Sequence, residues 1–226
     1  MEETLQIILD TSEAWALLLP LTFLAFKKIN KEPVKEVILY LWIAFFINLA
    51  MVIISFLPEF YDEKKLPFLL YNNTIEYNIH SIFRVLLFTL YFIRISHDTL
   101  HLQRKIILAL FFTFVAVNFV FFESPVQLFS SRLFTVEAIV LLFFCIYFYL
   151  NAITQERNEK LSRQPVFWIV TGLSVYEAVN FFIFLLFTYL ANNYTIFAKN
   201  IWNLHNISYI ILCIFITKAF YESRRK

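Results

Sequence analysis

The sequence predicts an all-α membrane protein that folds as a single domain, a bundle of seven transmembrane helices. The chain of 226 residues is 60% hydrophobic and only 16% charged, whereas a soluble domain carries roughly 45–50% apolar and about 25% charged residues. The excess apolar residues fall into long blocks, each close to the ~20 residues that a helix needs to cross a bilayer. These blocks leave too little chain for a soluble output domain.

The apolar blocks define the seven spans in order along the chain. We expect them at 8–26, 36–57, 76–96, 106–123, 133–153, 166–190 and 201–221. Pro20 lies inside the first span and predicts a kink there, because proline interrupts helical hydrogen bonding. Pro165 lies where the sixth span begins, which is the helix position that proline favours. The chain has one glycine, Gly172, so GxxxG helix packing is not expected.

The basic residues predict an N-terminus outside and a C-terminus in the cytoplasm. One set of connections, together with the C-terminal tail, holds Lys27, Lys28, Lys31, Lys35, Arg94, Arg104, Lys105, Arg157, Lys160, Arg163, Lys218, Arg224, Arg225 and Lys226. The opposite side has only Lys64, Lys65, Arg132 and Lys199. Cytoplasmic loops carry the excess of lysine and arginine. Because these residues lie at helix ends rather than in one patch, nucleic acid is not an expected partner.

The third span carries an unusual line of polar side chains. Glu76, His80 and Arg84 are spaced at i, i+4 and i+8, so they share one face of a helix. An arginine near the middle of a membrane is costly unless it faces protein or water and meets an acidic partner. The remaining helices must therefore direct carboxylates toward this face.

Other spans supply polar residues at matching depths. From their distances to the helix ends, Arg84 and Glu177 lie at similar height, and we predict that they form a deep ion pair. The other polar groups fall in the outer half of the bundle and predict a ligand pocket open to the outside. The pocket residues are Glu76, His80, Arg84, Glu137, Glu177, Asn180, Asn203, His205, Asn206 and Tyr209.

The same residues also have a purely structural interpretation. A buried Arg–Glu pair can serve to fix the register of packed helices, and asparagine or histidine at helix interfaces often only bonds across helices. We favour function for the cluster as a whole, because ionisable groups inside a membrane are usually functional.

Three kinds of chemistry compete with simple ligand binding. Glu76, His80 and His205 could ligate zinc or iron in a membrane hydrolase acting on a lipid, although seven-helix hydrolases use three histidines and only two lie inside these spans. A retinal pigment is not expected, because Lys218 lies near the cytoplasmic end of the last span. A transporter of protons or small solutes is the third alternative, disfavoured by the scarcity of glycine and the lack of an internal repeat. No catalytic residue and no resident cofactor are predicted.

The layout resembles the seven-helix sensory modules of bacterial sensor histidine kinases and their stand-alone relatives. The resemblance rests on the topology, on Pro165-Val166-Phe167-Trp168 opening the sixth span, and on Trp202-Asn203-Leu204-His205-Asn206 opening the seventh. It implies a sensory or ligand-binding subunit of the bacterial inner membrane, surrounded by lipid. Because no kinase domain follows Lys226, we expect a separate signalling partner at the membrane or in the cytoplasm.

Overall fold

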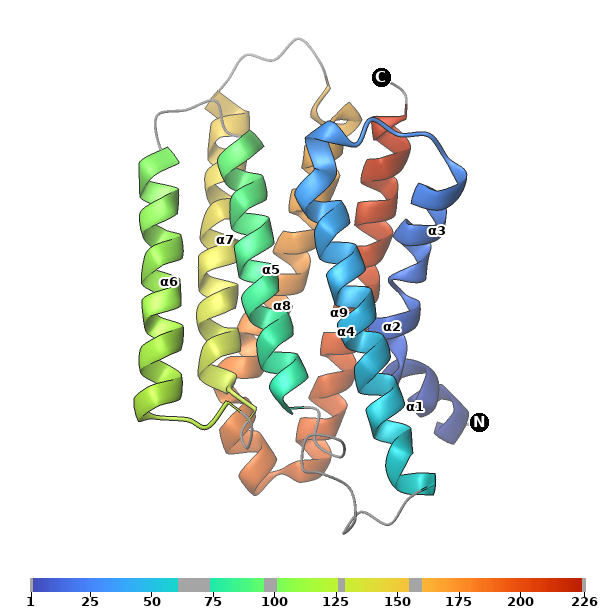
Figure 1. Ribbon diagram of the computed structural model, residues 1–226, viewed down its shortest axis with the longest axis vertical. Helices are drawn as coiled ribbons and strands as arrows, with labels where there is room; N and C mark the ends of the chain where they lie inside the picture. The colour runs from blue at the N-terminus through green and yellow to red at the C-terminus, as the bar shows by residue number, and fades with distance from the viewer. Residues whose placement is uncertain (1, 61–73, 96–100, 126–128, 155–159, 225–226) are drawn as a thin grey trace.

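The computed structural model describes residues 2–60, 74–95, 101–125, 129–154 and 160–224 (Figure 1). These residues form α-helices and short 3-10 turns, and the described part contains no strand. The helices are α1 (Glu2–Asp10), α2 (Ser12–Trp15), α3 (Leu18–Phe26), α4 (Lys35–Phe60), α5 (Thr74–Ile95), α6 (His101–Phe121), α7 (Ser131–Thr154), α8 (Pro165–Asn193) and α9 (Thr195–Ser223).

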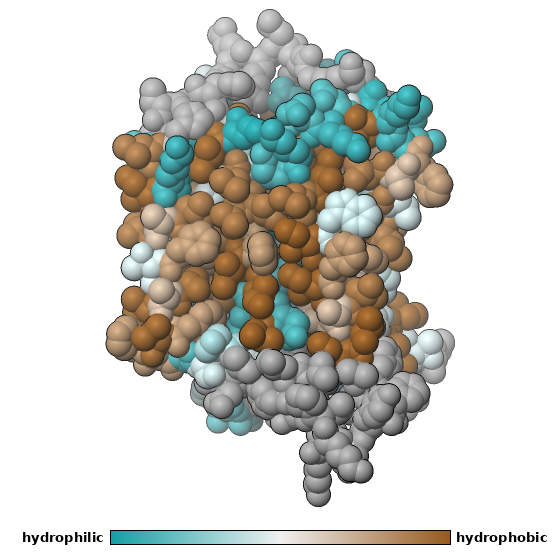
Figure 2. Space-filling view, in the orientation of Figure 1, coloured by the Kyte–Doolittle hydropathy of each residue, from teal (hydrophilic) through white to brown (hydrophobic). Residues whose placement is uncertain are grey.

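The helices are those of a multi-pass membrane protein. Within the described ranges, α4 to α9 are each long and apolar enough to cross a membrane, and the bent α1–α3 segment raises the number of candidate spans to as many as seven. In Figure 2 a broad hydrophobic band surrounds the bundle, with hydrophilic residues gathered at the end where α3 ends and α4 begins. We call this the basic end, and the opposite one the α8–α9 end. Of the basic residues counted above, Lys64, Lys65, Arg157, Arg225 and Lys226 lie outside the described residues.

Most predicted spans match helices to within a few residues. Pro165 is the first residue of α8, as predicted. The largest differences are at α1, which begins at Glu2 rather than near residue 8, and at α9, which begins at Thr195 rather than near residue 201. A helix can continue beyond its apolar block, and the hydropathy pattern cannot detect this extension. The first turns of α9 are largely exposed, with Ile196 82% accessible.

The first span is broken twice, and only one break follows from Pro20. Proline lacks the N–H that would bond the carbonyl of Ala16, and its ring crowds that carbonyl. The helix is accordingly interrupted at Ala16 and Leu17, where Leu19 N–H bonds Ala16 O instead at 3.1 Å. The sharper bend of 54° lies at Thr11, between Asp10 and Ser12. The sequence did not predict this second bend, which turns α1 away from the axis of α3.

The bundle is built around α5, α8 and α9. Helix α8 packs along both α7 and α9, whereas α5 packs against α4, α6 and α7. In Figure 1, α6 stands at the edge of the bundle and α5 lies between α7 and α4. Over its membrane window α5 is 56% buried, whereas α6 is only 22% buried. The side chains of α5 are therefore the ones that the rest of the fold encloses.

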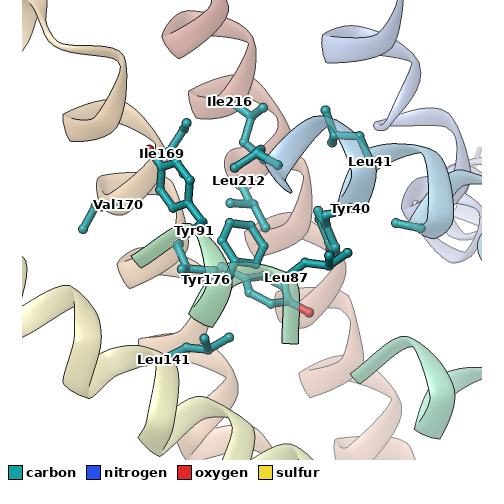
Figure 3. Packing of buried hydrophobic residues seen from close by; sticks show 14 of the residues in the cluster. Tyr40, Leu41, Leu87, Tyr91, Leu141, Ile169, Val170, Tyr176, Leu212 and Ile216 are labelled. Carbon is teal, nitrogen blue, oxygen red and sulfur yellow. The ribbon is translucent and has the colours of Figure 1, made fainter. Parts of the chain in front are cut away.

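Apolar side chains fill the half of the bundle near the basic end. Figure 3 shows Ile169 and Val170 of α8, Leu212 and Ile216 of α9, and Leu41 of α4 in the buried cluster that also contains Tyr91 and Tyr40. All five aliphatic residues are fully buried. Burying each such side chain stabilises the fold by about 1.5–3 kcal/mol in water, but in lipid the gain comes from close packing rather than from removal of water.

Helices α8 and α9 approach closely at Gly172. A Cβ atom at this position would lie 2.6 Å from Phe215 Cβ and 3.4 Å from Leu212 Cδ1. Because Phe215 Cβ is anchored directly to the α9 backbone, it cannot move away without moving the helix. Glycine at this position therefore sets the spacing between the two helices.

We expect Gly172→Ala to destabilise the protein. Overpacking costs about 1–3 kcal/mol, which exceeds the gain of about 1 kcal/mol that alanine brings to a helix. The measurement is the unfolding midpoint of detergent-purified protein. Leu186→Ala is the control, because Leu186 is 53% exposed on the same helix and should change the midpoint little. An unchanged or higher midpoint for Gly172→Ala would show that the helices can separate freely.

Candidate functional site

The polar line of α5 faces the interior of the bundle, as its arginine requires. Arg84 is 2% exposed and His80 is 3% exposed. Glu76, closest to the α8–α9 end, is half-buried. In Figure 2 a hydrophilic patch interrupts the hydrophobic band in its lower half, beside α5. The line thus runs from a partly exposed rim into the protein.

Arg84 is paired with Glu137 of α7 and with Tyr176 of α8. Its Nε donates to Glu137 Oε1, and its Nη2 lies 3.4 Å from Glu137 Oε2. Its Nη1 donates to the Tyr176 hydroxyl, whose ring centroid lies 4.8 Å from the guanidinium carbon. Ser81, one turn away on α5, donates to Glu137 Oε2 at 2.5 Å. We call Ser81, Arg84, Glu137 and Tyr176 the Arg84 cluster.

The predicted Arg84–Glu177 ion pair is wrong, because the carboxylate that pairs with Arg84 is that of Glu137. Helical side chains tilt toward the N-terminus of their own helix. Since α5 and α7 both begin at the α8–α9 end, Arg84 and Glu137 point toward that end. Helix α8 runs in the opposite direction (Figure 1), so Glu177 points toward the basic end. The prediction compared only the depths of the backbone positions in the membrane, and it therefore chose Glu177 instead of Glu137.

Glu177 nevertheless belongs to the same buried region. It is 1% exposed, and its Oε1 has no hydrogen-bond partner among the described residues. Its charge interacts with those of Glu137 and Arg84, and also with Cys145, about two turns further along α7 than Glu137. One arginine thus lies near two carboxyl groups.

A second polar group centres on His205 of α9. Its Nδ1 lies 2.7 Å from Asn180 Oδ1, and its Nε2 lies 2.6 Å from Glu13 Oε1. Both ring nitrogens therefore have an oxygen of a neighbouring side chain within hydrogen-bond distance. His205 therefore joins α2, α8 and α9 at one point.

Aromatic rings connect His80 to both groups. The His80 ring stacks on Tyr40, with centroids 5.8 Å apart, and meets the edge of Tyr209 at 6.4 Å. The hydroxyls of Tyr40 and Tyr209 are 3.3 Å apart. Tyr176 contacts the rings of both His205 and Tyr209. His80 Nε2 itself is buried and has no partner in the described part of the chain.

The two remaining predicted residues lie on α9 and differ sharply. Asn203 is half-buried and exchanges hydrogen bonds with Gln6 of α1, at 3.2 and 3.3 Å. Asn206 is 1% exposed, and neither Nδ2 nor Oδ1 has a partner among the described residues. A buried amide without hydrogen bonds costs about 1–3 kcal/mol per group.

Sequence reasoning missed Glu13, Tyr176, Tyr40 and Ser81. The hydropathy pattern gives no reason to bring Glu13 into the interior, whereas the bend at Thr11 allows it to reach His205. No sequence signal distinguished the two tyrosines and the serine from ordinary residues of a membrane helix. The one indication in the sequence was Arg84 itself, because a buried guanidinium needs oxygen atoms nearby that accept its hydrogen bonds.

The residues predicted to hold zinc or iron do not form a metal site in the structure. His205 is bonded to Asn180 and Glu13, whereas His80 stacks on Tyr40. Among the described residues, no three His, Cys, Asp or Glu side chains are gathered as a metal ion would need. A zinc site requires three or four such ligands. The described residues therefore give the metal-dependent alternative no support.

Comparison with protein-family models, with curated proteins and with solved structures finds no match for this chain. The resemblance to seven-helix sensory modules therefore stays a prediction, and the site has to be interpreted from its own residues.

We expect Glu137→Gln to destabilise the protein by about 3–5 kcal/mol, because it leaves the buried Arg84 charge without its counter-ion. The measurement is the free energy of unfolding in mixed detergent micelles. Arg132→Gln is the control, since Arg132 is largely exposed and lies 3.7 Å from Glu123, a pairing worth at most about 1 kcal/mol.

The double variant Arg84→Met/Glu137→Leu should recover much of the lost stability, because it removes both buried charges together. Equal effects of Glu137→Gln and Arg132→Gln would contradict the role assigned to the Arg84–Glu137 pair.

Proposed function

We propose that the chain crosses the membrane seven times, with the N-terminus outside and the C-terminus in the cytoplasm. The bent α1–α3 segment would be the first crossing, and α4 to α9 the other six. Two observations support this topology: α1 and the last turn of α9 lie toward opposite ends of the bundle (Figure 1), and basic residues gather where cytoplasmic loops would be. On this topology the α8–α9 end faces outward.

Cysteine labelling tests this topology. In a background of Cys145→Ala and Cys213→Ala, which removes both native thiols, we expect Lys199→Cys to react with an impermeant maleimide in intact cells. Lys31→Cys should react only after the membrane is opened. Both positions are exposed, so equal labelling in detergent serves as the control. Labelling of Lys31→Cys in intact cells would reverse the proposed orientation.

We further propose that the bundle binds a small polar ligand in its outward half and acts as a sensory or ligand-binding membrane subunit. The observation that carries this proposal is Asn206. Its whole side-chain amide is buried and has no hydrogen-bond partner among the described residues. Selection for stability alone would not favour this, because an apolar residue of similar size would cost less. A ligand that offers both a donor and an acceptor would satisfy it.

Further unpaired groups lie in the same part of the bundle. His80 Nε2, Asn180 Nδ2 and Glu76 Oε2 are all buried atoms that lack partners within the described ranges. Each can hydrogen-bond a polar ligand or the waters around it. Glu76 and Asn203 are half-buried, whereas Asn206 and His80 are almost completely buried. A ligand entering from the α8–α9 end would therefore meet Glu76 and Asn203 first and Asn206 and His80 last.

A signal from this region would travel through α9. The helix carries His205, Asn206 and Tyr209 near the proposed site. At its other end Ser223 donates to the carbonyl of Asn30 at 3.0 Å, in the segment before α4. A ligand that changes the packing of α9 against α8 would move this contact at the basic end, where a separate signalling partner would bind. Such coupling requires that the ligand bind two states of the bundle with different affinity.

We expect Asn206→Leu to raise the free energy of unfolding, or leave it unchanged, because it removes two unsatisfied buried groups. Asn78→Leu is the matched control. Asn78 is also 1% exposed, but it donates to Pro125 O at 2.9 Å and accepts from Ser130 N at 3.3 Å. Removing it should cost about 1–3 kcal/mol, since its partners would be left unpaired.

The same variants test ligand binding. Detergent-purified wild type is heated with a panel of polar metabolites that carry both donors and acceptors. We expect at least one to raise the melting temperature of the wild type and of Asn78→Leu, but not of Asn206→Leu, because a ligand stabilises only a fold that binds it. If Asn206→Leu is as destabilised as Asn78→Leu, Asn206 is a structural residue and the proposal fails.

A further inference from the structure

The region around Arg84 contains an unbalanced charge. Arg84, Glu137 and Glu177 are each at most 2% exposed, and they interact electrostatically with one another. If all three were ionised, one positive and two negative charges would share an interior from which water is excluded. An uncompensated buried charge is strongly unfavourable, and such groups are usually found paired or neutral.

Glu177 is the carboxyl group that remains uncompensated. Glu137 receives hydrogen bonds from Arg84 and Ser81, whereas Glu177 Oε1 receives none from the described residues. The Tyr176 hydroxyl, beside Glu177 in sequence, is already engaged by Arg84. Among the described residues, Glu177 Oε1 therefore has no hydrogen-bond donor, and the nearby cation, Arg84, is ion-paired with Glu137 instead.

Three helices place ionisable or polar groups around Glu177, and its sequence neighbour Tyr176 also interacts with it electrostatically. Helix α5 contributes Arg84 and α7 contributes Glu137 and Cys145, each in electrostatic contact with Glu177. On α8, Asn180 is one turn away toward the α8–α9 end, and its buried Nδ2 has no partner among the residues that the structure describes. Arg84 is the one cation in this set, and its guanidinium is already bonded to Glu137 and Tyr176.

We propose that Glu177 reversibly binds one proton, so that the bundle contains an ion-binding site distinct from the polar-ligand region at Asn206. A proton from water forms an O–H bond at the free carboxyl oxygen, which neutralises the second carboxylate of the region. The proton is the cation that fits, because it needs neither space nor a shell of several oxygen ligands. Ionisable groups placed in this way inside membranes mark proton pathways in other proteins.

The surrounding packing gives this site access from one side. Toward the basic end, Glu177 is followed along α8 by Leu173 and Val170, both fully buried, and α7 covers the region with Leu141. Figure 3 shows Val170 and Leu141 in this packed region. Toward the α8–α9 end, Asn180 leads to His205 and Glu13. Glu177 therefore exchanges its proton with the side of the membrane that the α8–α9 end faces.

Infrared spectroscopy of the detergent-purified protein tests the proposal. We expect the C=O stretching band of a protonated carboxylic acid at neutral pH, shifted in D₂O and replaced by carboxylate bands at high pH. The band should be lost in Glu177→Gln and kept in Glu123→Gln, a control whose carboxylate is ion-paired with Arg132 near the surface. Glu177→Asp, which retains a carboxyl group, should keep a displaced band even if Glu177→Gln folds poorly.

Two results would overturn the assignment. Absence of the band in the wild type at neutral pH, or its persistence in Glu177→Gln, would show that Glu177 does not carry the proton. A band that appears in choline chloride and vanishes in sodium chloride would identify the bound cation as sodium. None of these readouts involves Asn206 or a ligand. The experiment can therefore disprove the proton site without disproving the proposed ligand region, and the ligand-binding test can disprove the ligand region without disproving the proton site.

Discussion

The structure depends on enclosing one arginine inside a bundle that lipid surrounds. Arg84 cannot face hydrocarbon, so α5 must be the most enclosed helix, and α7 and α8 must both present oxygen atoms to it. Glu137 supplies the charge, and the Tyr176 hydroxyl supplies a further acceptor. Each partner comes from a different helix, so the relative rotation of α5, α7 and α8 is fixed by hydrogen-bond geometry as well as by packing. Apolar packing alone would constrain this rotation far less, because lipid-facing and buried leucines are chemically alike.

Tyr176 connects the Arg84 cluster to the rest of the polar region. Its hydroxyl accepts from Arg84, while its ring contacts His205 and Tyr209. Tyr209 in turn reaches Tyr40 and His80. Tyrosine suits this position because it combines an apolar ring with one polar atom. The polar region thus extends across six helices, α2, α4, α5, α7, α8 and α9. A change in one part must displace rings that the other parts share.

The sequence was sufficient to predict an all-helical membrane protein and the residues that lie deep in it, because membrane crossing imposes length and hydropathy on every span. It also predicted that Arg84 faces protein, since the alternative is too costly. It could not identify the partner of Arg84: depth estimated from Cα positions ignores the opposite tilt of side chains on antiparallel helices, and this tilt selects Glu137 over Glu177. Glu13 was missed for a different reason. Its approach to His205 depends on the bend at Thr11, and no proline or glycine marks that bend.

The division of the bundle into two halves constrains how the protein can respond to what it binds. In one half, His80, Asn180 and Asn206 each carry a buried polar side-chain atom without a partner among the described residues. The other half is filled mainly by closely packed side chains such as Leu212 and Ile216, and between them lie the hydroxyls of Thr89 and Tyr91, which also have no partner in the described part of the chain. A densely packed core transmits displacement, because its side chains have few empty spaces to move into. Binding in the polar half would therefore be felt at the basic end chiefly through rigid movement of α9 against α8. Gly172 lies on this interface, where a Cβ atom would come within 2.6 Å of Phe215 Cβ. Gly172 is the one glycine of the chain. Any movement of α9 against α8 would therefore change the close contact between Gly172 and Phe215.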